Sequence, residues 1–292
     1  MRSTDPVRWR CARCSHSGCH DAARSAPRVA PRWSCPAASR WTSSATSRSD
    51  GRARTLTAST ASCPQYQRSR HYGREGSAIA DFLARHQGAP LLIGARHGET
   101  LWNEEDRLTT RTDIPLSSRG EEQAQALSEA LGNLEFDRAW ASPKRRAWRT
   151  AEIALAGVKL GSPLSADARL VERDAGVLEG AVFSTLQDPA CQLNPAWAAY
   201  STEGSPVMPP GAEPWPAVLT RVQSLLEDAH REGGRTFIVG HGALLRILAC
   251  VVMGLDPTHF RRLKLDNCGL IVVRFYECPP NQILAFNLPA EC

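Results

Sequence analysis

Two short apolar runs that each end in a glycine-flanked histidine constrain this chain more than any other feature. Residues 91–98 read LLIGARHG, and residues 236–242 read TFIVGHG. An apolar run of this length that stops at a polar turn is typical of a buried strand. Each run therefore predicts a strand that delivers an imidazole to one edge of a sheet. The first run also delivers Arg96, and a neutral histidine beside a guanidinium fork indicates phosphate chemistry.

The rest of the chain supplies the other groups that a phosphoryl transfer needs, namely further cations and an acid. Arg145 and Arg146 follow a strand-like segment at 136–142 and stand at the start of a predicted helix. A phosphate placed there would also be stabilised by the helix N-terminus. Glu172 ends another apolar segment and is the candidate acid. The pattern predicts one site that neutralises a phosphoryl group and protonates a leaving oxygen.

Four motifs carry a family resemblance. They are, in order along the chain, RHGETLWN, SPKRRAWRTAE, ERDAGVLEG and VGHGALLR. In order and spacing they resemble the histidine phosphatase superfamily, which includes the cofactor-dependent phosphoglycerate mutases, over about residues 90–288. The resemblance implies an α/β fold, a three-layer α/β/α sandwich with a mixed, mostly parallel sheet. It also implies a phosphohistidine intermediate, formed without a metal ion or a cofactor.

The resemblance implies a role for each matching residue. His97 falls on the nucleophile, Glu172 on the proton donor, and Arg96, Arg146 and His241 on the phosphate pocket. The remaining predicted substrate-binding residues are Asn103, Gly98, Thr109, Thr110 and Gly242. Thr109 and Thr110 stand where many relatives carry a Gln-Gly-Trp stretch, which changes the pocket mouth.

Several charged residues near the motifs have a simpler interpretation. Arg145 is expected to be a solvated charge at a helix start, and Glu179 ranks behind Glu172 as the acid because it lies past the glycine of the motif. Glu99, Arg173 and Asp174 are expected to be surface groups, since turn segments are normally polar.

The remaining segments predict an alternating α/β chain. Ser118 and Glu121 form a capping-box pattern before a helix over 118–134. A second helix is expected at about 215–232, after a proline-rich loop. The run ALLRILACVVMGL after His241 is apolar enough for a buried helix and too short to span a bilayer. Residues 269–277 and 282–288 predict two closing strands. The family resemblance further implies that the segment 181–216 covers the site and sets specificity.

Residues 1–77 differ in composition from the rest. They contain fourteen arginines, no lysine and four acidic residues, a formal charge of +10, so the remaining chain carries −5. With few aliphatic residues this segment cannot bury enough apolar surface to offset its ordering entropy, and we expect disorder. The catalytic domain is therefore expected over 78–292.

Four interpretations of residues 1–77 compete. Its arginine and serine content resembles an organelle transit peptide, although the amphipathic periodicity is poor. A basic tail could bind nucleic acid, but no folded binding module accompanies it, so we do not expect a nucleic-acid partner. A zinc site drawn from Cys11, Cys14, Cys19 and His20 lacks a second properly spaced pair. We favour a misassigned start, in which upstream codons have been translated as protein.

Three functions remain open at this stage. The favoured one is hydrolysis of a small phosphorylated metabolite by a histidine acid-type phosphatase. The first alternative is a phosphoglycerate mutase, which needs additional cations for a second acidic group, whereas 181–216 contains no Lys or Arg. The second alternative is a non-catalytic scaffold that binds phosphorylated ligands. Scattered cysteines and the lack of an apolar leader or a span of ~20 apolar residues favour a cytoplasmic enzyme without a membrane partner. The sequence does not predict the oligomeric state.

Overall fold

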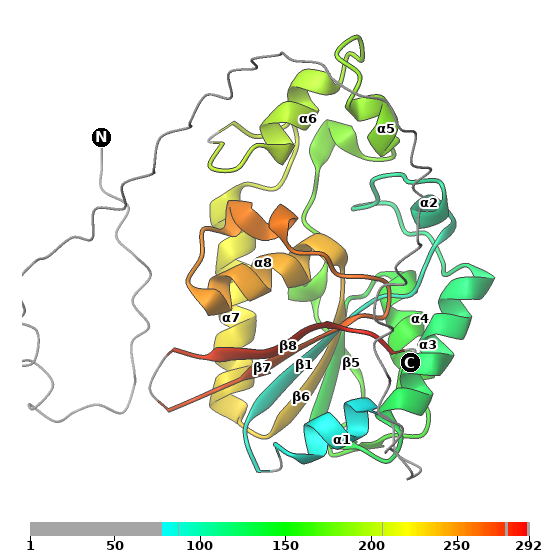
Figure 1. Ribbon diagram of the computed structural model, residues 1–292, viewed down its shortest axis with the longest axis vertical. Helices are drawn as coiled ribbons and strands as arrows, with labels where there is room; N and C mark the ends of the chain where they lie inside the picture. The colour runs from blue at the N-terminus through cyan, green and yellow to red at the C-terminus, as the bar shows by residue number, and fades with distance from the viewer. Residues whose placement is uncertain (1–77, 87, 206, 278–279, 291–292) are drawn as a thin grey trace, which may run out of the picture. The chain divides into compact units, whose positions relative to one another are not determined.

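The computed structural model describes residues 78–86, 88–205, 207–277 and 280–290. Residues 1–77, for which the sequence predicts a disordered basic segment, lie outside the described residues. The described chain begins with helix α1 (Ala78–Ala84) and is built around one six-stranded sheet (Figure 1).

The sheet is mixed and mostly parallel. Its strands lie in the order β5-β3-β6-β1-β7-β8. Their bounds are β1 (Leu91–Arg96), β3 (Arg138–Ala141), β5 (Ser165–Ala166), β6 (Arg235–Gly240), β7 (Leu270–Arg274) and β8 (Gln282–Leu288). Strands β5, β3, β6 and β1 are parallel, and β7 is antiparallel to both of its neighbours, β1 and β8. Within this sheet only β7 therefore runs against the others.

Helices cover both faces of the sheet and make three layers. On one side lie α1, α3 (Ser118–Leu131) and α4 (Arg145–Ala154), and on the other lie α7 (Trp215–Glu232) and α8 (Gly242–Met253) (Figure 1). Alternating side chains of β1 feed two separate cores: Leu91 and Ile93 join the first group of helices, and Leu92 joins the second. A period of two is what a strand buried on both faces requires. The predicted three-layer fold is confirmed.

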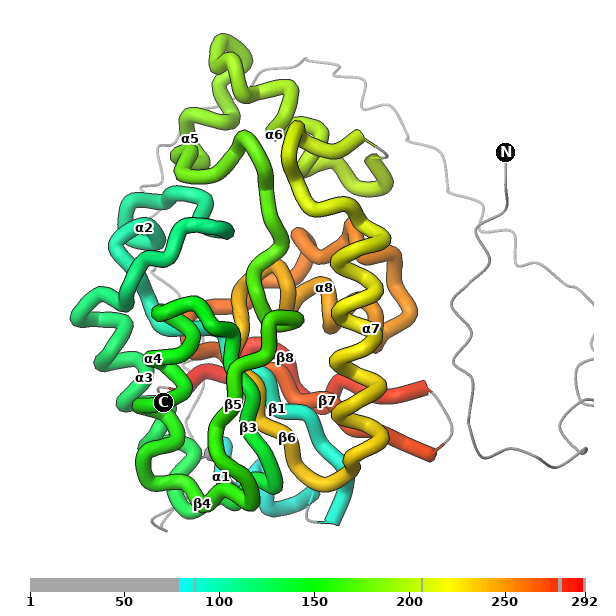
Figure 2. Tube along the Cα trace, turned by 180° about the vertical axis from the view of Figure 1, so that it is seen from behind, coloured from blue at the N-terminus to red at the C-terminus, as the bar shows by residue number. Residues whose placement is uncertain are grey.

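The segment between β5 and α7 extends past the carboxyl ends of the strands. It contains two 3₁₀ turns, η1 (Ala168–Leu170) and η2 (Gly176–Leu178), and two short helices, α5 (Phe183–Leu186) and α6 (Asn194–Ser201). Figure 2 shows the chain rising from β5 to α5 and α6 and returning down α7. The described part of the proline-rich stretch before α7, residues 207–214, is a loop, as expected. The residues before it form α5 and α6, which the sequence did not predict and which pack through Leu186, Trp197 and Tyr200 into the α7–α8 core.

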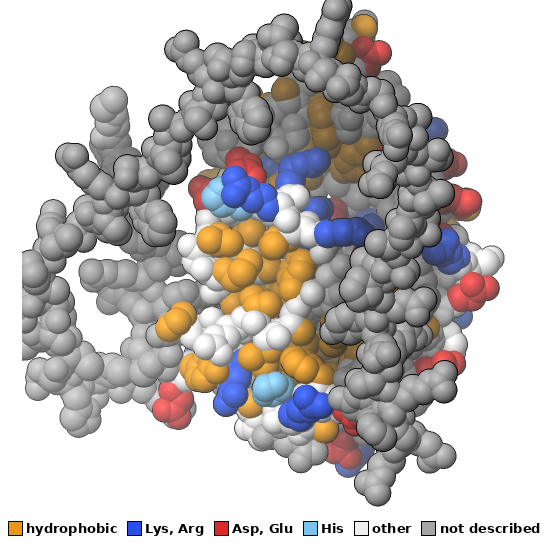
Figure 3. All heavy atoms as spheres, viewed as in Figure 1, with side chains coloured by type: hydrophobic (Ala, Val, Ile, Leu, Met, Phe, Trp, Pro, Cys, Tyr) orange, Lys and Arg blue, Asp and Glu red, His pale blue; other side chains and the backbone are white. Residues whose placement is uncertain are grey.

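The carboxyl-terminal half of the fold closes the sheet. After α8 the chain passes through η3 (Pro257–Arg262) into β7 and the edge strand β8. Hydrophobic side chains gather on the surface over α8 and the two closing strands (Figure 3). The residues of β8 after Gln282 are half-buried, as expected of an edge strand with one open side. No described helix combines the length and the apolar character that crossing a membrane requires.

Two local predictions were wrong in detail. The cap of α3 is Ser117, whose side chain accepts a hydrogen bond from the Gly120 N–H, and not Ser118. The helix ends at Leu131 because Gly132 takes a positive φ of 51° as its C-cap, three residues before the predicted end.

The expected strand at 136–142 is divided between two sheets. Residues Glu135–Phe136 form β2, which pairs in parallel with β4 (Lys159–Leu160), and β3 starts after Asp137. Asp137 accepts a hydrogen bond from the Arg235 N–H at 2.6 Å, which ties the break between the strands to the start of β6.

Candidate functional site

Three neighbouring parallel strands end at the same edge of the sheet, and each is followed by a residue of the predicted site. Arg96 and Gly240 are register partners at the ends of β1 and β6, so the next residues, His97 and His241, emerge side by side. Their ring centroids are 5.1 Å apart and the rings meet edge to face. Strand β3 ends beside β6 and leads through Ser142 into α4, which begins one residue before Arg146. Ligand sites of parallel sheets lie at this edge.

The hydrogen bonds of His97 determine which of its ring nitrogens carries the proton. Nδ1 lies 2.6 Å from the carbonyl oxygen of Gly98, which can only accept, so Nδ1 carries the proton. Nε2 therefore holds the lone pair, and the Nε of Arg146 donates to it at 3.3 Å. Burial lowers the pKa of His97 well below its usual range, and the charges of Arg146 and Arg96 lower it further. The imidazole is therefore neutral at pH 7.

Arg146 is a fully buried cation held on both sides. Besides its contact with His97, its Nη1 donates to the carbonyl oxygen of Thr112 at 2.9 Å and its Nη2 to that of Thr110 at 3.4 Å. Burial lowers the pKa of Arg146, and the negative charges of Glu172 and other carboxylates oppose this shift. Arg145 is exposed, as expected for a solvated charge.

His241 is fully buried, and its Nε2 lies 2.9 Å from the Ser142 hydroxyl. Burial lowers the pKa of His241 well below its usual range, and the charges of Arg146, His97 and Arg96 act in the same direction. The neutral form of His241 is therefore favoured at pH 7. Its Nδ1 is buried without a hydrogen-bond partner in the described part of the chain.

Arg96 fits into a space that Gly242 leaves open. Its Nη1 donates to the carbonyl oxygen of Leu265 at 2.8 Å, while its Nε is buried and has no partner among the described residues. A Cβ at Gly242 would lie 3.3 Å from that Nε, so a glycine here lets the α8 backbone approach the guanidinium closely. Burial, together with the charge of Arg246, lowers the pKa of Arg96 to about 10.

Glu172 lies at the amino end of α8. Its Oε2 accepts a hydrogen bond from the Ala243 N–H at 2.9 Å, and its Oε1 accepts from the N–H groups of Leu244 and Arg173 at 2.9 and 2.8 Å. A carboxylate is stabilised at a helix N-terminus by such unpaired N–H groups. Ala243, which binds the predicted acid, lies two residues after His241 in the sequence. The negative charge of Glu172 also raises the pKa of Arg96 and of Arg146, against the effect of their burial.

The other predicted binding residues have structural partners. The Asn103 Oδ1 accepts from the Thr100 N–H at 3.2 Å in the capping box of α2 (Leu101–Glu104), and no partner of its Nδ2 is found among the described residues. The Gly98 N–H donates to the Thr150 hydroxyl at 3.0 Å, and a Cβ on Gly98 would lie 2.3 Å from the Gly120 oxygen. Gly98 thus lets α3 approach the His97 loop.

Thr109 and Thr110 use their side chains within the fold. The Thr109 hydroxyl donates to the Arg107 oxygen at 3.4 Å, and the buried Thr110 hydroxyl is bound to the carboxylate of Glu179. The structure brings the Thr110 carbonyl to Arg146, but it shows no contact of either hydroxyl with His97.

Sequence reasoning missed three polar residues that support the histidines. Asn267 donates from Nδ2 to the His97 oxygen at 2.9 Å, Ser142 contacts His241, and Thr150 links Gly98 to the Arg146 oxygen. Thr150 lies four residues after Arg146 on α4, so helical spacing could have placed it beside the site. Nothing in the sequence around Asn267 marks it.

The expectation that Arg173 is a surface group is wrong. Its side chain is fully buried, with the guanidinium 3.9 Å from the centre of the Trp215 ring and 4.7 Å from that of Tyr200. Its Nε and Nη1 have no partner within the described ranges. The aromatic rings take the place of water around the guanidinium. Because both rings come from remote parts of the chain, the polar residues next to Arg173 in the sequence could not predict its burial. Glu99 and Asp174 are partly buried.

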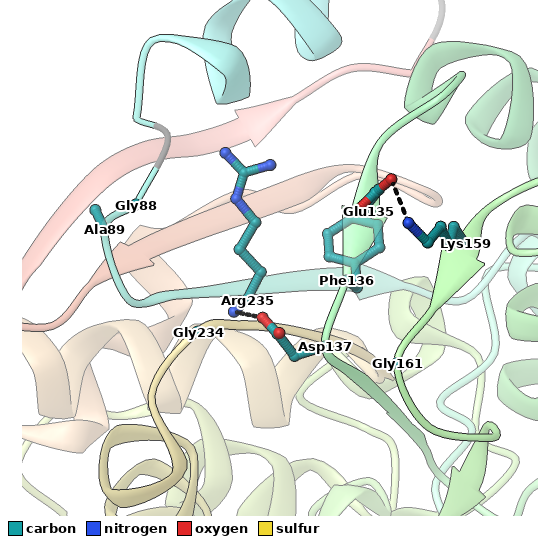
Figure 4. Close-up of a pocket in the computed structure, with 9 residues that line it drawn as sticks. All are labelled: Gly88, Ala89, Glu135, Phe136, Asp137, Lys159, Gly161, Gly234 and Arg235. Carbon is teal, nitrogen blue, oxygen red and sulfur yellow. Dashed lines mark hydrogen bonds and ion pairs between the residues drawn. The ribbon is translucent and has the colours of Figure 1, made fainter.

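A cavity elsewhere in the fold is separate from this site. It has a volume of about 340 Å³ and lies at the amino ends of β1 and β6, where Ala89, Asp137 and Arg235 line it (Figure 4). Glu135 and Lys159 form an ion pair there at 2.9 Å. It lies at the opposite end of these strands from the histidines. Among the described residues, no group of three or more His, Cys, Asp or Glu side chains is arranged to hold a metal ion.

Comparison with known proteins agrees with the fold. The model of the histidine phosphatase superfamily (branch 1) matches residues 92–288, and the chain belongs to this family. A probable phosphoglycerate mutase GpmB from Enterobacter sp. (strain 638) is 34% identical over 189 residues, which cover 63% of this chain and 84% of that protein.

Solved structures show the same fold. A phosphoserine phosphatase from Entamoeba histolytica, solved in complex with 3-phosphoglyceric acid, aligns with a TM-score of 0.57 at 24% identity over 68% of this chain and 96% of its own. An α-ribazole phosphatase from Shigella flexneri aligns with a TM-score of 0.57 at 23% identity over 68% of this chain and 96% of its own. The chain thus shares its fold with proteins named as phosphatases and its sequence with one named as a probable mutase.

Proposed function

We propose that this chain is a phosphomonoester hydrolase, a histidine acid-type phosphatase that acts on a small phosphorylated metabolite through a phosphohistidine. The observation that carries the proposal is the state of His97: a buried, neutral imidazole with Nδ1 bound to a carbonyl oxygen and Nε2 directed toward a buried guanidinium. A nucleophile needs this tautomer, and a phosphoryl group needs the adjacent positive charge.

Two buried nitrogens that lack partners among the described residues support the binding of an anion here: the Arg96 Nε, and the His241 Nδ1 in the tautomer in which Nε2 accepts from the Ser142 hydroxyl. Buried polar groups are nearly always hydrogen-bonded, so the Arg96 Nε and the His241 Nδ1 are expected to bind oxygens that the protein itself does not supply. Together with Arg146 they would surround the equatorial oxygens of a phosphoryl group attached at His97. Asn103 would add its Nδ2 as a further donor.

The reaction is proposed to proceed in two steps. His97 Nε2 attacks phosphorus in line, the bond from phosphorus to the ester oxygen breaks, and Glu172 donates a proton to that oxygen. The Oε2 of Glu172 has a single N–H partner, so this oxygen has room for the proton. In the second step Glu172 takes a proton from water, which attacks the phosphohistidine and releases inorganic phosphate. The groups named here are all side chains of the chain itself, and we propose that no cofactor takes part.

The runner-up function is phosphoglycerate mutase-type transfer, and Arg173 is the observation that favours it. The segment 181–216 lacks cations, but Arg173 follows the acid directly, and two of its buried donors find no hydrogen-bond partner in the described part of the chain. Such a group would bind a second acidic group of the substrate. Replacing Arg173 by Met should raise the KM for a phosphoglycerate about tenfold, a loss of about 1.4 kcal/mol, and leave the KM for p-nitrophenyl phosphate within about twofold. Equal changes for both substrates would argue against a second acidic group.

One experiment separates the functions. Purified protein and the His97→Ala variant are incubated with p-nitrophenyl phosphate, sugar phosphates and phosphoglycerates, and both phosphate release and isomer interconversion are measured. Phosphate release that His97→Ala abolishes supports the phosphatase. Interconversion without release would support the mutase, and binding without turnover would support a scaffold.

We place the enzyme in the cytoplasm on the basis of the free thiols of Cys191 and Cys250.

A further inference from the structure

Glu179, which the sequence ranks only as a second candidate acid, lies at the centre of a polar network beside the site. Its carboxylate accepts hydrogen bonds from the backbone N–H groups of Thr110, Arg111 and Thr112 at 2.9, 3.2 and 2.9 Å, and from the Thr110 hydroxyl. One side chain thus fixes three successive residues that lie about seventy positions earlier in the chain. The carboxylate is fully used and holds no free oxygen for acid catalysis.

The turn that Glu179 fixes also binds Arg146. While its N–H groups point to Glu179, the carbonyl oxygens of Thr110 and Thr112 accept from the two terminal nitrogens of the Arg146 guanidinium. The Nε of the same guanidinium contacts His97. The chain of contacts runs without a gap from Glu179 through the 110–112 turn to Arg146 and the nucleophile.

The same turn also anchors the helix that carries Arg146. The Asp113 Oδ1 accepts a hydrogen bond from the Arg145 N–H at 2.8 Å, and the Lys144 Nζ donates to the Arg111 oxygen. Lys144 is the N-cap of α4 and makes no side-chain cap of its own. A shift of the 110–113 segment would therefore displace both the guanidinium and the first turn of α4.

We propose that Glu179 is a positioning residue that holds Arg146 in register with His97 by clamping the 110–112 turn. This inference rests on the proposed function, because Arg146 matters to the rate only if a phosphoryl group binds beside His97. Glu179 acts at a distance through the turn and does not touch the reacting atoms.

The chemistry of the clamp specifies a carboxylate. Two oxygens receive four donors, two at each oxygen. A Glu179→Gln substitution preserves the shape but replaces one oxygen by an NH₂ group, which would face N–H donors and leave them without an acceptor. Burial alone would raise the pKa of Glu179, but the hydrogen bonds from Thr110, Thr112 and Arg111 outweigh it and lower the pKa. The carboxylate therefore stays ionised throughout the neutral range.

The test is a double-substitution cycle with p-nitrophenyl phosphate. Glu179→Gln should lower kcat/KM about a hundredfold, the loss expected when a catalytic group is misplaced by about 1 Å, and should weaken inhibition by orthovanadate in parallel. In an Arg146→Ala background the same substitution should change kcat/KM by less than about twofold, because the group that it positions is already absent.

Asp174→Asn provides the matched control. Asp174 lies in the same segment and its substitution also removes a charge. Its carboxylate accepts from the Gly176 N–H and pairs with the Arg111 guanidinium at 3.6 Å, but the N–H groups of residues 110–112 donate to Glu179 and not to Asp174. It should retain activity within about twofold. Each variant is checked for a cooperative thermal transition, and Glu179→Asp replaces Glu179→Gln if the latter does not fold.

The outcomes separate the two proposals. If Glu179→Gln costs the same factor with and without Arg146, or if it leaves vanadate inhibition unchanged, the positioning role is wrong. If His97→Ala retains turnover, the proposed function itself fails, whatever Glu179 does.

Discussion

The strongest quantitative consequence of the site concerns Arg146 and its neighbour Arg145. The two arginines are adjacent in sequence at the start of α4, yet one is fully buried against His97 and the other is exposed. Removing one preorganised donor from a site where negative charge develops costs about 10²–10³ in kcat, or about 2.7–4 kcal/mol. Arg146→Ala removes a donor and a full charge, so we expect a loss of about 10³-fold in kcat/KM.

A lysine at this position tests which property of Arg146 is needed. Lysine retains the charge but is a single ammonium group and cannot reach His97 and the carbonyl oxygens of Thr110 and Thr112 at the same time. Arg146→Lys should therefore lose about 10²-fold, between wild type and Arg146→Ala.

The assay is steady-state hydrolysis of p-nitrophenyl phosphate by the wild type and by the Ala and Lys variants of Arg146, with Arg145→Ala as the control. The control should stay within about twofold of wild type, since it removes only a solvated charge. Circular dichroism melting establishes that each variant is folded. A folded Arg146→Ala variant within tenfold of wild type, or an Arg145→Ala variant that loses as much, would refute the reasoning.

Two further predictions concern the acid and the buried histidines. Glu172→Gln should slow hydrolysis of alkyl phosphates about 10²–10⁴-fold and hydrolysis of p-nitrophenyl phosphate much less, because a good leaving group needs no proton. Phosphate release measures both rates. Equal losses on the two kinds of ester would contradict the role of Glu172. His97 and His241 have lowered pKa values in the folded chain, so the unfolded chain binds more protons below its ordinary histidine pKa of about 6.5. The free energy of unfolding should therefore fall as the pH drops from about 6.5 toward the lower folded-state pKa values, and the fall should shrink in a His97→Gln variant in urea titrations. The same slope in wild type and variant would show that His97 does not titrate in this way.

Much of the fold could be predicted because its signals are local. The apolar runs at β1 and β6 have the length and composition of buried strands. The helices predicted at about 215–232 and after His241 agree with the observed bounds of α7 and α8 to within about two residues. Parallel strands end at a common edge, so the proximity of His97 and His241 follows once both runs are assigned as strands.

The parts that the sequence did not predict depend on contacts between distant segments. Strands β2, β4 and β5 have two residues each, too few for a periodic pattern. By its sequence, Arg173 belongs to a polar turn. It is buried because Tyr200 from α6 and Trp215, the first residue of α7, pack over its guanidinium. Glu179 was assessed for acidity alone, since its partners at 110–112 are remote and are mostly backbone groups.

The central claim is that His97 becomes phosphorylated during turnover, and rapid-quench trapping measures this directly. Wild-type protein mixed with a ³²P-labelled phosphomonoester and quenched in alkali should carry acid-labile, alkali-stable label on a peptide that contains residue 97. The label should appear and decay at rates compatible with turnover, and His97→Ala should carry none. Turnover by the wild type without such label, or label that persists in the His97→Ala variant, would contradict the account.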